Sequence, residues 1–220
     1  MDGPDGKERR LRKYEASPEP VAAAAGDPPL ELFSPFGPLI ARLRVPDALV
    51  ERLNARIDAL APGERAEERV LTEALVTEGG EGSLVRVTAN LVRRYAAQAE
   101  GDAVDRVEFE SFWVVRQTAG APSPVHFHSS DVSGVLYLRL PEVDPGEERK
   151  TYISDRRAGY INFLIGGKQR FAKSLVSFKP RVGDFYVFPG WLLHGAEPFR
   201  GRGERRSLAF NAILPPPSRD

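Results

Sequence analysis

The sequence predicts a mainly β domain with two helices packed outside it. From Val107 onward, short runs rich in β-branched and aromatic residues alternate with Gly, Pro, Asp and Ser, which is typical of strands joined by turns. The runs are VEFESFWVVRQ, VSGVLYLRL, YINFLI, FAKSLVSF, DFYVF and RSLAFNAIL. Because no helical segment separates these runs, we expect a sandwich or a barrel.

Length and composition are consistent with one such domain. The chain has 220 residues, 41% of them hydrophobic, which is enough for a sizeable core. Its 31 basic and 31 acidic residues cancel, so no overall field would attract nucleic acid or an anionic membrane. The chain has no cysteine, which excludes disulfides, thiolate ligands and thiol catalysis. Imidazole and carboxylate groups must therefore supply any metal ligands.

Residues 1–29 are predicted to form a disordered N-terminal arm. They are rich in charged residues, Pro and Ala, and their longest apolar run is VAAAA, which is too short for a secretion signal or a membrane span. Residues 30–220 are expected to form the single domain. We therefore expect a cytoplasmic protein that does not bind a membrane and does not have nucleic acid as its partner.

Two segments show the spacing of amphipathic helices. In PDALVERLNARIDALAP, Asp47 is the expected N-cap and Pro62 the expected stop. In SLVRVTANLVRRYAAQAEG, Ser83 is the expected cap and Gly101 ends the helix. The first apolar stripe is Leu49, Leu53, Ile57 and Leu60, and the second is Leu84, Val87, Leu91, Val92 and Tyr95. Both helices are expected on the outside of the β structure.

The placement of the histidines is the most specific signal for function. The chain has 3 His, of which His126 and His128 lie in VHFH and His194 lies in PGWLLHG. Residues at i and i+2 of a strand share a face, so the first two imidazoles can point the same way. Two imidazoles with a distant third form a pattern of metal ligands. Non-haem iron(II) accepts three such ligands on one face and keeps its other positions open.

These motifs resemble the 2-oxoglutarate and iron(II)-dependent oxygenase superfamily. The resemblance lies in an H-x-H segment followed by SGVLYL, then GDFYVFPGWLLHG and ERRSLAFN. More narrowly, the chain is similar to a bacterial and phage group of such oxygenases with an H-x-H and SG-x-x-Y-L run and a final R-x-S-x-x-F-N strand. The likeness spans about residues 30–215 and is strongest from Trp113 to Asn211. It implies a double-stranded β-helix, the jelly-roll core that cupins also have.

The resemblance implies that His126 is the first iron ligand and His194 the last. The superfamily usually has H-x-D or H-x-E at the first site, whereas this chain has His128 two positions after His126. Two alternatives are open: either His128 binds the iron, or Asp131 reaches in from the turn and His128 supports the site without binding. We favour His128, because the period of a strand places it beside His126.

The resemblance also implies 2-oxoglutarate as the cosubstrate. This dicarboxylate chelates iron through its keto-acid end, and its far carboxylate needs a cation, for which Arg offers a planar two-pronged donor. Arg205 follows His194 where the superfamily commonly places this Arg, and Ser207 lies on the same strand face. An alternative is that Arg205 is one more exposed cation in the charged GRGERR turn.

Strand alternation extends this cosubstrate site. It places Ala209 and Asn211 on the same face as Arg205, and Arg206 on the opposite face with Leu208 and Phe210. On another run, Ser133, Val135, Tyr137 and Arg139 are expected to share a face. Tyr137 could therefore donate a hydrogen bond to the same carboxylate, although aromatic residues such as Tyr137 and Trp113 more often belong to the core than to a site.

The leading hypothesis is a dioxygenase, and specifically a hydroxylase, that uses iron(II), dioxygen and 2-oxoglutarate on an unknown substrate and releases succinate. One alternative is a cupin-like three-histidine metalloenzyme that does not use 2-oxoglutarate. Another is a noncatalytic binding module. Exposed sheet edges or the two helices could also mediate a homodimer.

Overall fold

The computed structural model describes residues 30–33, 37–60, 68–101, 104, 106–121, 123–147, 157–166 and 173–215. The predicted N-terminal arm, residues 1–29, lies outside the described residues. The strands are β1 (Glu31–Phe33), β2 (Ile40–Arg44), β3 (Glu68–Val70), β4 (Glu108–Gln117), β5 (Val132–Arg139), β6 (Glu142–Val143), β7 (Ile161–Leu164), β8 (Leu175–Phe178), β9 (Asp184–Pro189), β10 (Leu193–Ala196), β11 (Gly201–Arg202) and β12 (Arg205–Ile213). The helices are α2 (Asp47–Asp58), α3 (Glu73–Thr77), the 3-10 helix η2 (Gly80–Gly82) and α4 (Leu84–Glu100).

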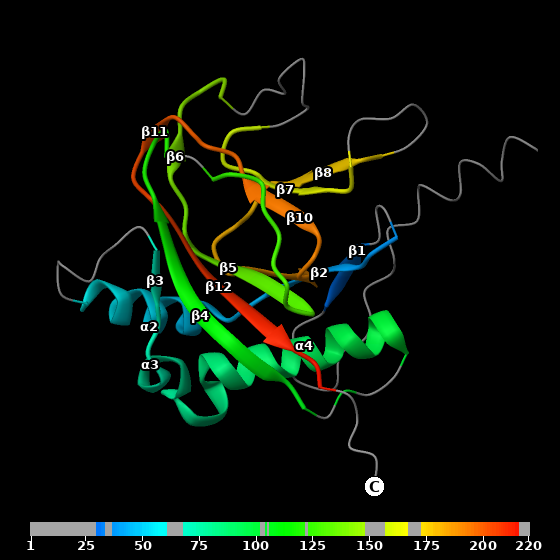
Figure 1. Cartoon of the computed structure of the whole chain (residues 1–220). Helices are drawn as coiled ribbons and strands as arrows, with labels where there is room; N and C mark the ends of the chain where they lie inside the picture. The colour runs from blue at the N-terminus through cyan, green and yellow to red at the C-terminus, as the bar shows by residue number, and fades with distance from the viewer. Residues whose placement is uncertain are drawn as a thin grey trace, which may run out of the picture.

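Two antiparallel sheets form the body of the fold. The larger has 7 strands in the order β1-β2-β9-β5-β12-β4-β3, and the smaller has 3 strands in the order β10-β7-β8. A pair formed by β11 and β6 lies at one end (Figure 1). Strands that are distant in sequence, such as β5 and β12, are neighbours in the larger sheet. This is the antiparallel jelly-roll arrangement expected of a double-stranded β-helix.

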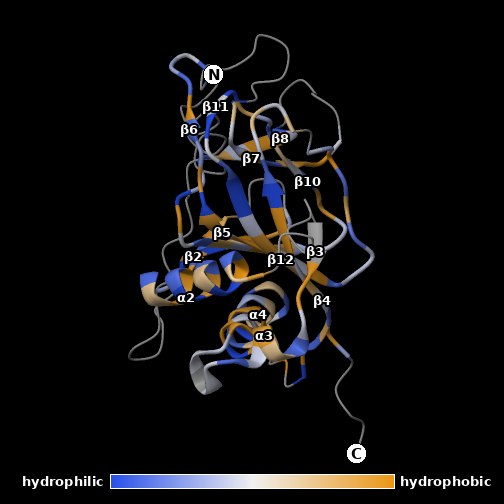
Figure 2. Cartoon of the chain, turned by 90° about the vertical axis from the view of Figure 1, so that its left-hand side faces the viewer, coloured by the Kyte–Doolittle hydropathy of each residue, from blue (hydrophilic) through white to orange (hydrophobic). Residues whose placement is uncertain are grey.

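The helices cover the outer face of the larger sheet, as expected (Figure 1). Their apolar residues and one face of the sheet form a single core cluster, which includes Leu53, Leu91, Leu136 and Phe210. Figure 2 shows hydrophobic residues on the helices and along the strands where these two layers meet. A second cluster, which includes Phe163, Tyr186 and Phe188, fills part of the space between the two sheets. No helix of the described residues is long and apolar enough to span a membrane.

The ends of the two long helices follow the predicted signals only in part. The Ser83 hydroxyl accepts a bond of 3.4 Å from the Arg86 amide, and Gly101 ends α4 in the left-handed conformation at φ 82°, both as predicted. The prediction for Asp47 was wrong. Pro46 precedes α2 without capping it through a side chain, and Asp47 is the first helical residue. There its carboxylate complements the helix dipole and lies 3.4 Å from Arg44.

The six predicted strand runs correspond to β4, β5, β7, β8, β9 and β12. Shorter strands were missed, and the most important of these is β10, which carries His194. Its four residues include a glycine and lack the β-branched character of the longer runs. It is a strand because Leu193 to Ala196 pair antiparallel with β7.

A β-bulge corrects one expected face of β5. In the pairing with β12, Arg206 lies opposite Arg139 and Ser207 lies opposite Tyr137, so Leu138 is an extra residue on β5. A bulge changes the side on which the following side chain points. Arg139 therefore does not share a face with Tyr137. Its guanidinium pairs with Asp58 of α2 on the outer side of the sheet.

Candidate metal centre

His126 and His194 face each other across an isolated antiparallel bridge. The backbone N–H of each residue donates to the carbonyl of the other, at 2.9 Å in both directions. His194 belongs to β10 of the smaller sheet, whereas His126 lies in the connection that leads into β5. Backbone pairing therefore brings together two residues that are far apart in the sequence.

His128 is held at the same place by the turn that follows β9. Its backbone N–H donates to the Gly190 carbonyl at 2.8 Å, and the Gly190 N–H donates to the Asp131 carbonyl at 3.0 Å. Position 190 needs glycine, because a Cβ there would collide with the backbone carbonyl of Ser130. The motifs VHFHSSD and PGWLLHG are thus two sides of one bonded structure.

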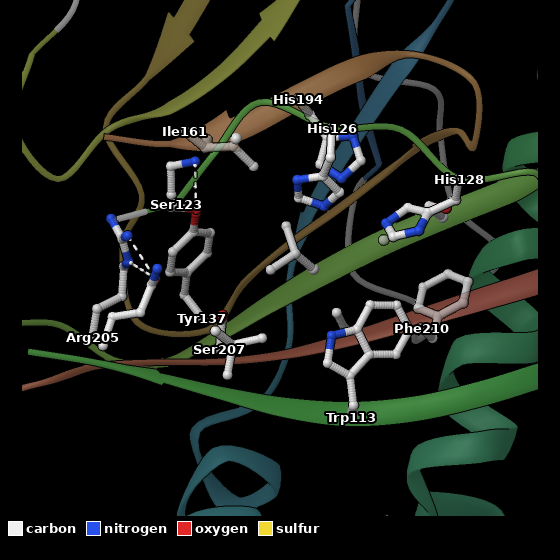
Figure 3. A pocket seen from close by; sticks show the side chains of 18 of the residues that line it. Trp113, Ser123, His126, His128, Tyr137, Ile161, His194, Arg205, Ser207 and Phe210 are labelled. Carbon is white, nitrogen blue, oxygen red and sulfur yellow. Dashed lines mark hydrogen bonds between the residues drawn. The ribbon is translucent and has the colours of Figure 1, made fainter. Parts of the chain in front are cut away.

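The three imidazoles converge on one point. One ring nitrogen from each of His126, His128 and His194 can be chosen so that all three lie within 4.8 Å of one another. The ring centroids are 4.4 Å apart for His126 and His194, 5.0 Å for His126 and His128, and 5.3 Å for His128 and His194. Figure 3 shows the three rings at one end of a pocket. This spacing suits three ligands around one cation.

Asp131, the alternative to His128, lies outside this group. Its carboxylate accepts a bond of 2.8 Å from the backbone N–H of Leu214, just beyond the end of β12. The same carboxylate therefore satisfies a main-chain donor. The geometry places His128, and not Asp131, beside His126 and His194.

Hydrogen bonds prepare two of the rings for metal binding. The Nδ1 atom of His126 lies 2.8 Å from the Pro124 carbonyl, and that of His194 lies 2.8 Å from the Leu192 carbonyl. A carbonyl can only accept, so each Nδ1 must carry the proton. The Nε2 lone pair of each neutral ring is then available to a cation.

The electrostatics favour the same neutral state. Burial lowers the pKa of the His194 imidazole to about 3, with smaller contributions from His126 and His128. Burial and then the neighbouring His126 also lower the pKa of His128. At neutral pH both rings are therefore uncharged and able to act as ligands. The residues present fit a divalent cation held by imidazole nitrogen.

A pocket of about 370 Å³ extends from these histidines between the two sheets. Arg205 and Tyr137 lie at the end away from His128 (Figure 3). The walls between the two ends are largely apolar, and among the residues that the structure describes no Asp, Glu or Lys lines the pocket. The apolar lining includes Trp113, Val115, Val135, Ile161, Phe188 and Phe210.

Arg205 is a buried cation and not an exposed residue of a charged turn, because only 1% of it is accessible. Its Nε and Nη2 donate to the Gln117 side-chain oxygen at 2.9 and 2.6 Å, and Nη1 donates to the Glu197 carbonyl at 2.8 Å. These bonds use three of the five N–H groups of a guanidinium. Burial lowers the pKa of Arg205 while Tyr137 and Glu197 oppose this, and a guanidinium stays charged in proteins.

The other predicted cosubstrate residues line the same pocket. Tyr137 from β5 and Ser207 from β12 are cross-strand partners, and both are buried. Burial raises the pKa of the Tyr137 phenol to about 12, so the phenol keeps its proton at neutral pH and can donate. Ala209 also lines the pocket, as predicted. The Asn211 side chain accepts a bond of 2.7 Å from Ser133, which is itself a lining residue.

Two lining residues have roles that the sequence did not indicate. Gln117, the last residue of β4, holds the guanidinium of Arg205. Trp113, which belongs to a residue type found more often in the core, is half-buried, and its ring centroid lies 5.7 Å from that of His128. Position on β4 was the only available signal, because β4 pairs with β12 and so faces the same cavity.

Comparisons with known proteins agree with this fold and site. Residues 111–211 match the family described as "Putative 2OG-Fe(II) oxygenase". A search of curated proteins found no match. The match contains the three histidines, Arg205 and Gln117.

Solved structures share the architecture. A viral collagen prolyl hydroxylase from Paramecium Bursaria Chlorella virus-1 aligns with a TM-score of 0.52 at 14% identity, covering 91% of this chain and 100% of that chain. A prolyl-4-hydroxylase from Pseudomonas putida aligns with a TM-score of 0.50 at 18% identity, covering 78% and 91%. HygX from Streptomyces hygroscopicus, solved with iron bound, aligns with a TM-score of 0.50 at 15% identity, covering 79% and 81%. At these identities the likeness shows the fold.

The fold is a double-stranded β-helix, and its three histidines form a candidate metal centre. Residues 111–211, a little under half of the chain, are similar to the 2-oxoglutarate and iron(II)-dependent oxygenases that this family comprises. The resemblance drawn from the sequence motifs is therefore confirmed.

Proposed function

We propose that this protein is a 2-oxoglutarate and iron(II)-dependent oxygenase, specifically a hydroxylase, in which His126, His128 and His194 hold the iron. The observation that carries the proposal is the convergence of three imidazoles, with ligand atoms within 4.8 Å, at one end of a pocket that has a buried arginine at its other end. The third ligand is then a neutral imidazole in place of the usual carboxylate. The metal consequently keeps a greater positive charge, which favours anionic ligands at its remaining positions.

The other half of the proposal is that Arg205 receives the far carboxylate of 2-oxoglutarate. Arg205 is buried, and the acceptors that its guanidinium contacts directly are neutral, while the carboxylate of Glu197 acts on it only through space. A buried charge that is not bonded directly to a counter-ion is costly, and an anion that enters the pocket and binds it lowers this cost. Tyr137 and Ser207 line the same end and add hydroxyl groups that can donate to the carboxylate.

The side chains of the pocket would bind the metal, orient the cosubstrate and shield both from water. The metal and its cosubstrate would supply the oxidation. When bound, iron(II) and 2-oxoglutarate consume dioxygen, yield succinate and carbon dioxide, and oxidise the substrate. The chain contributes three fixed ligands and a cation that orients the cosubstrate along the pocket. The apolar walls exclude water, which strengthens the electrostatic interactions inside. We further propose that residues 30–220 form the single domain that carries this activity.

The test is direct. Purified protein is incubated with ferrous iron, 2-oxoglutarate and oxygen, and succinate is measured with and without a candidate substrate. We expect slow, oxygen-dependent succinate formation that a chelator abolishes. Absence of both succinate and 2-oxoglutarate binding to the iron-loaded protein would overturn the proposal. A cupin-like enzyme that does not use 2-oxoglutarate would instead bind iron and show no response to Arg205→Ala.

A further inference from the structure

Arg205 and Arg206 are adjacent on β12, yet the groups that bind their guanidinium ions differ in charge. Arg206 is fully buried on the helix side, where its Nη2 lies 2.6 Å from a carboxylate oxygen of Asp58 and 2.6 Å from one of Glu204. Arg205 points into the pocket, where its side-chain partner is the amide of Gln117. The first charge is bonded directly to carboxylates, whereas the hydrogen-bond acceptors of the second are neutral and Glu197 acts on it only through space.

The same contrast appears on the paired strand. In the register of β4 and β12, Arg206 lies opposite Arg116 and Arg205 lies opposite Gln117. Arg116 donates to Glu204 through Nε and Nη2, at 3.0 and 2.7 Å. The outer side of this strand pair therefore holds cations and carboxylates, whereas its pocket side holds a cation and a neutral amide.

A neutral acceptor at position 117 can orient the guanidinium of Arg205 without neutralising its charge, which a carboxylate could not do. Two bonds to one amide oxygen fix the plane of the guanidinium and prevent rotation. Because the amide carries no charge, the positive charge of Arg205 remains for a ligand. A glutamate of the same length would make similar bonds but would neutralise the cation.

We propose that Gln117 is a positioning residue for cosubstrate binding: it orients Arg205 as a neutral acceptor and so keeps the guanidinium charge available for a carboxylate. This inference rests on the proposed function, because it assigns the partner of that charge as the far carboxylate of 2-oxoglutarate. It also states which property of position 117 matters, namely its lack of charge. Side-chain length and packing come second.

Two substitutions at position 117 distinguish the effect of a charge from the effect of a lost hydrogen-bond acceptor. Gln117→Glu keeps the length and acceptor geometry and adds a charge, and the adjacent Arg205 favours its ionised form. Gln117→Leu removes the acceptor without adding a charge. We expect Gln117→Glu to raise the Kd for 2-oxoglutarate by about tenfold or more, since it competes with a charge-assisted bond. Gln117→Leu should raise the Kd less and should lower the thermal midpoint more.

The measurement is anaerobic calorimetry of 2-oxoglutarate binding to the manganese-loaded protein, with thermal midpoints recorded for each variant. Glu204→Gln is the matched control, because it makes the reverse change of acceptor on the outer side of the same strand pair. It should lower the thermal midpoint and leave the Kd within about twofold of the wild type. A Gln117→Glu protein that binds 2-oxoglutarate as the wild type does, or better than Gln117→Leu, would overturn the inference.

A second measurement keeps this inference separate from the proposed function. Glutarate has the far carboxylate but lacks the keto-acid group, so it probes the Arg205 end in metal-free protein. We expect glutarate to raise the thermal midpoint of the wild type and not that of Gln117→Glu. If this result holds while 2-oxoglutarate yields no succinate, the charge inference stands and the oxygenase proposal fails. If glutarate stabilises both proteins equally, the inference fails by itself.

Discussion

His126 and His194 exchange backbone hydrogen bonds of 2.9 Å in both directions, so two iron-ligand candidates are joined by main-chain pairing. Main-chain pairing holds the Cα positions without depending on the side chains. The two imidazoles can consequently be replaced one at a time without separating the segments that carry them. Substitutions at this site should therefore report on metal binding more than on folding.

Substitutions of His128 and Asp131 should show which of the two residues binds the metal and which has only a structural role. His128→Ala should weaken iron(II) or manganese(II) binding by more than the roughly 10-fold to 100-fold that loss of an outer-shell partner costs, because it removes one of three converging nitrogens. Asp131→Ala should leave metal affinity unchanged and lower the free energy of unfolding by about 1 kcal/mol, because the Leu214 N–H loses its acceptor. Metal titration and urea unfolding of both variants measure these effects. A large loss of metal affinity in Asp131→Ala would reverse the assignment.

Arg205→Ala should raise the KM for 2-oxoglutarate by about 100-fold while iron affinity stays within twofold, since a charge-assisted contact is lost at the far end of the pocket. Arg205→Lys should recover only part of the loss, because an ammonium cannot bind the carboxylate in a two-pronged way. Succinate formation at varied 2-oxoglutarate gives both values. Equal KM values for Arg205→Ala and the wild type would exclude this residue from the cosubstrate site.

Trp113 should report metal binding optically. The chain has 2 Trp, and Trp191 is 55% exposed, so Trp191→Phe leaves Trp113 as the single indole fluorophore. Its ring centroid lies 5.7 Å from that of His128, which is close enough for a paramagnetic ion to quench its emission. We expect ferrous or cobalt ions to quench this variant and zinc to quench it much less. Quenching that persists in His126→Ala, with unchanged affinity, would place the metal elsewhere.

The free energy of unfolding should decrease in acid, because Asp58 and Glu204 pair with arginines on the outer side of the larger sheet. Although burial opposes it, bonding to Arg116 and Arg206 lowers the pKa of Glu204, and bonding to Arg206 lowers that of Asp58. Lowered carboxyl pKa values contribute stability that is fully present above the unfolded values, about 3.9 for Asp and about 4.3 for Glu, and is lost as pH falls through the folded values. Urea unfolding from pH 7 to pH 3 should show this loss. Glu204→Gln should flatten the curve, and an unchanged slope would exclude these ion pairs as its cause.

Gly134 in the SGVLYL motif should tolerate no side chain. A Cβ at this position would overlap the ring of Phe210 and the backbone carbonyl of Tyr186. Gly134→Ala should therefore lower the free energy of unfolding by about 1–3 kcal/mol through overpacking. Gly146→Ala is a useful comparison, because a Cβ at that turn meets nothing within 4 Å, although its φ of 93° adds some backbone strain. Similar unfolding energies for Gly134→Ala and the wild type would contradict the packing argument.

Local pattern was sufficient for the long elements. Alternating β-branched runs predicted the central strands, and helical spacing with Ser83 and Gly101 predicted α4. Strand alternation also placed Arg205 and Arg206 on opposite faces, as the structure has them. These predictions succeeded because side-chain direction repeats every two residues in a strand, whatever the strand pairs with.

What the sequence determined by itself was therefore the β-rich class, the family motifs and three histidines of the right chemistry for a metal. Tertiary structure alone decided that β10 is a strand, that Leu138 forms a bulge and turns Arg139 outward, and that Asp131 bonds to Leu214. It also decided that Gln117 meets Arg205 with a neutral oxygen. Each of these depends on which segment lies opposite in a sheet. Pairing between segments distant in the chain leaves no periodic trace in either one.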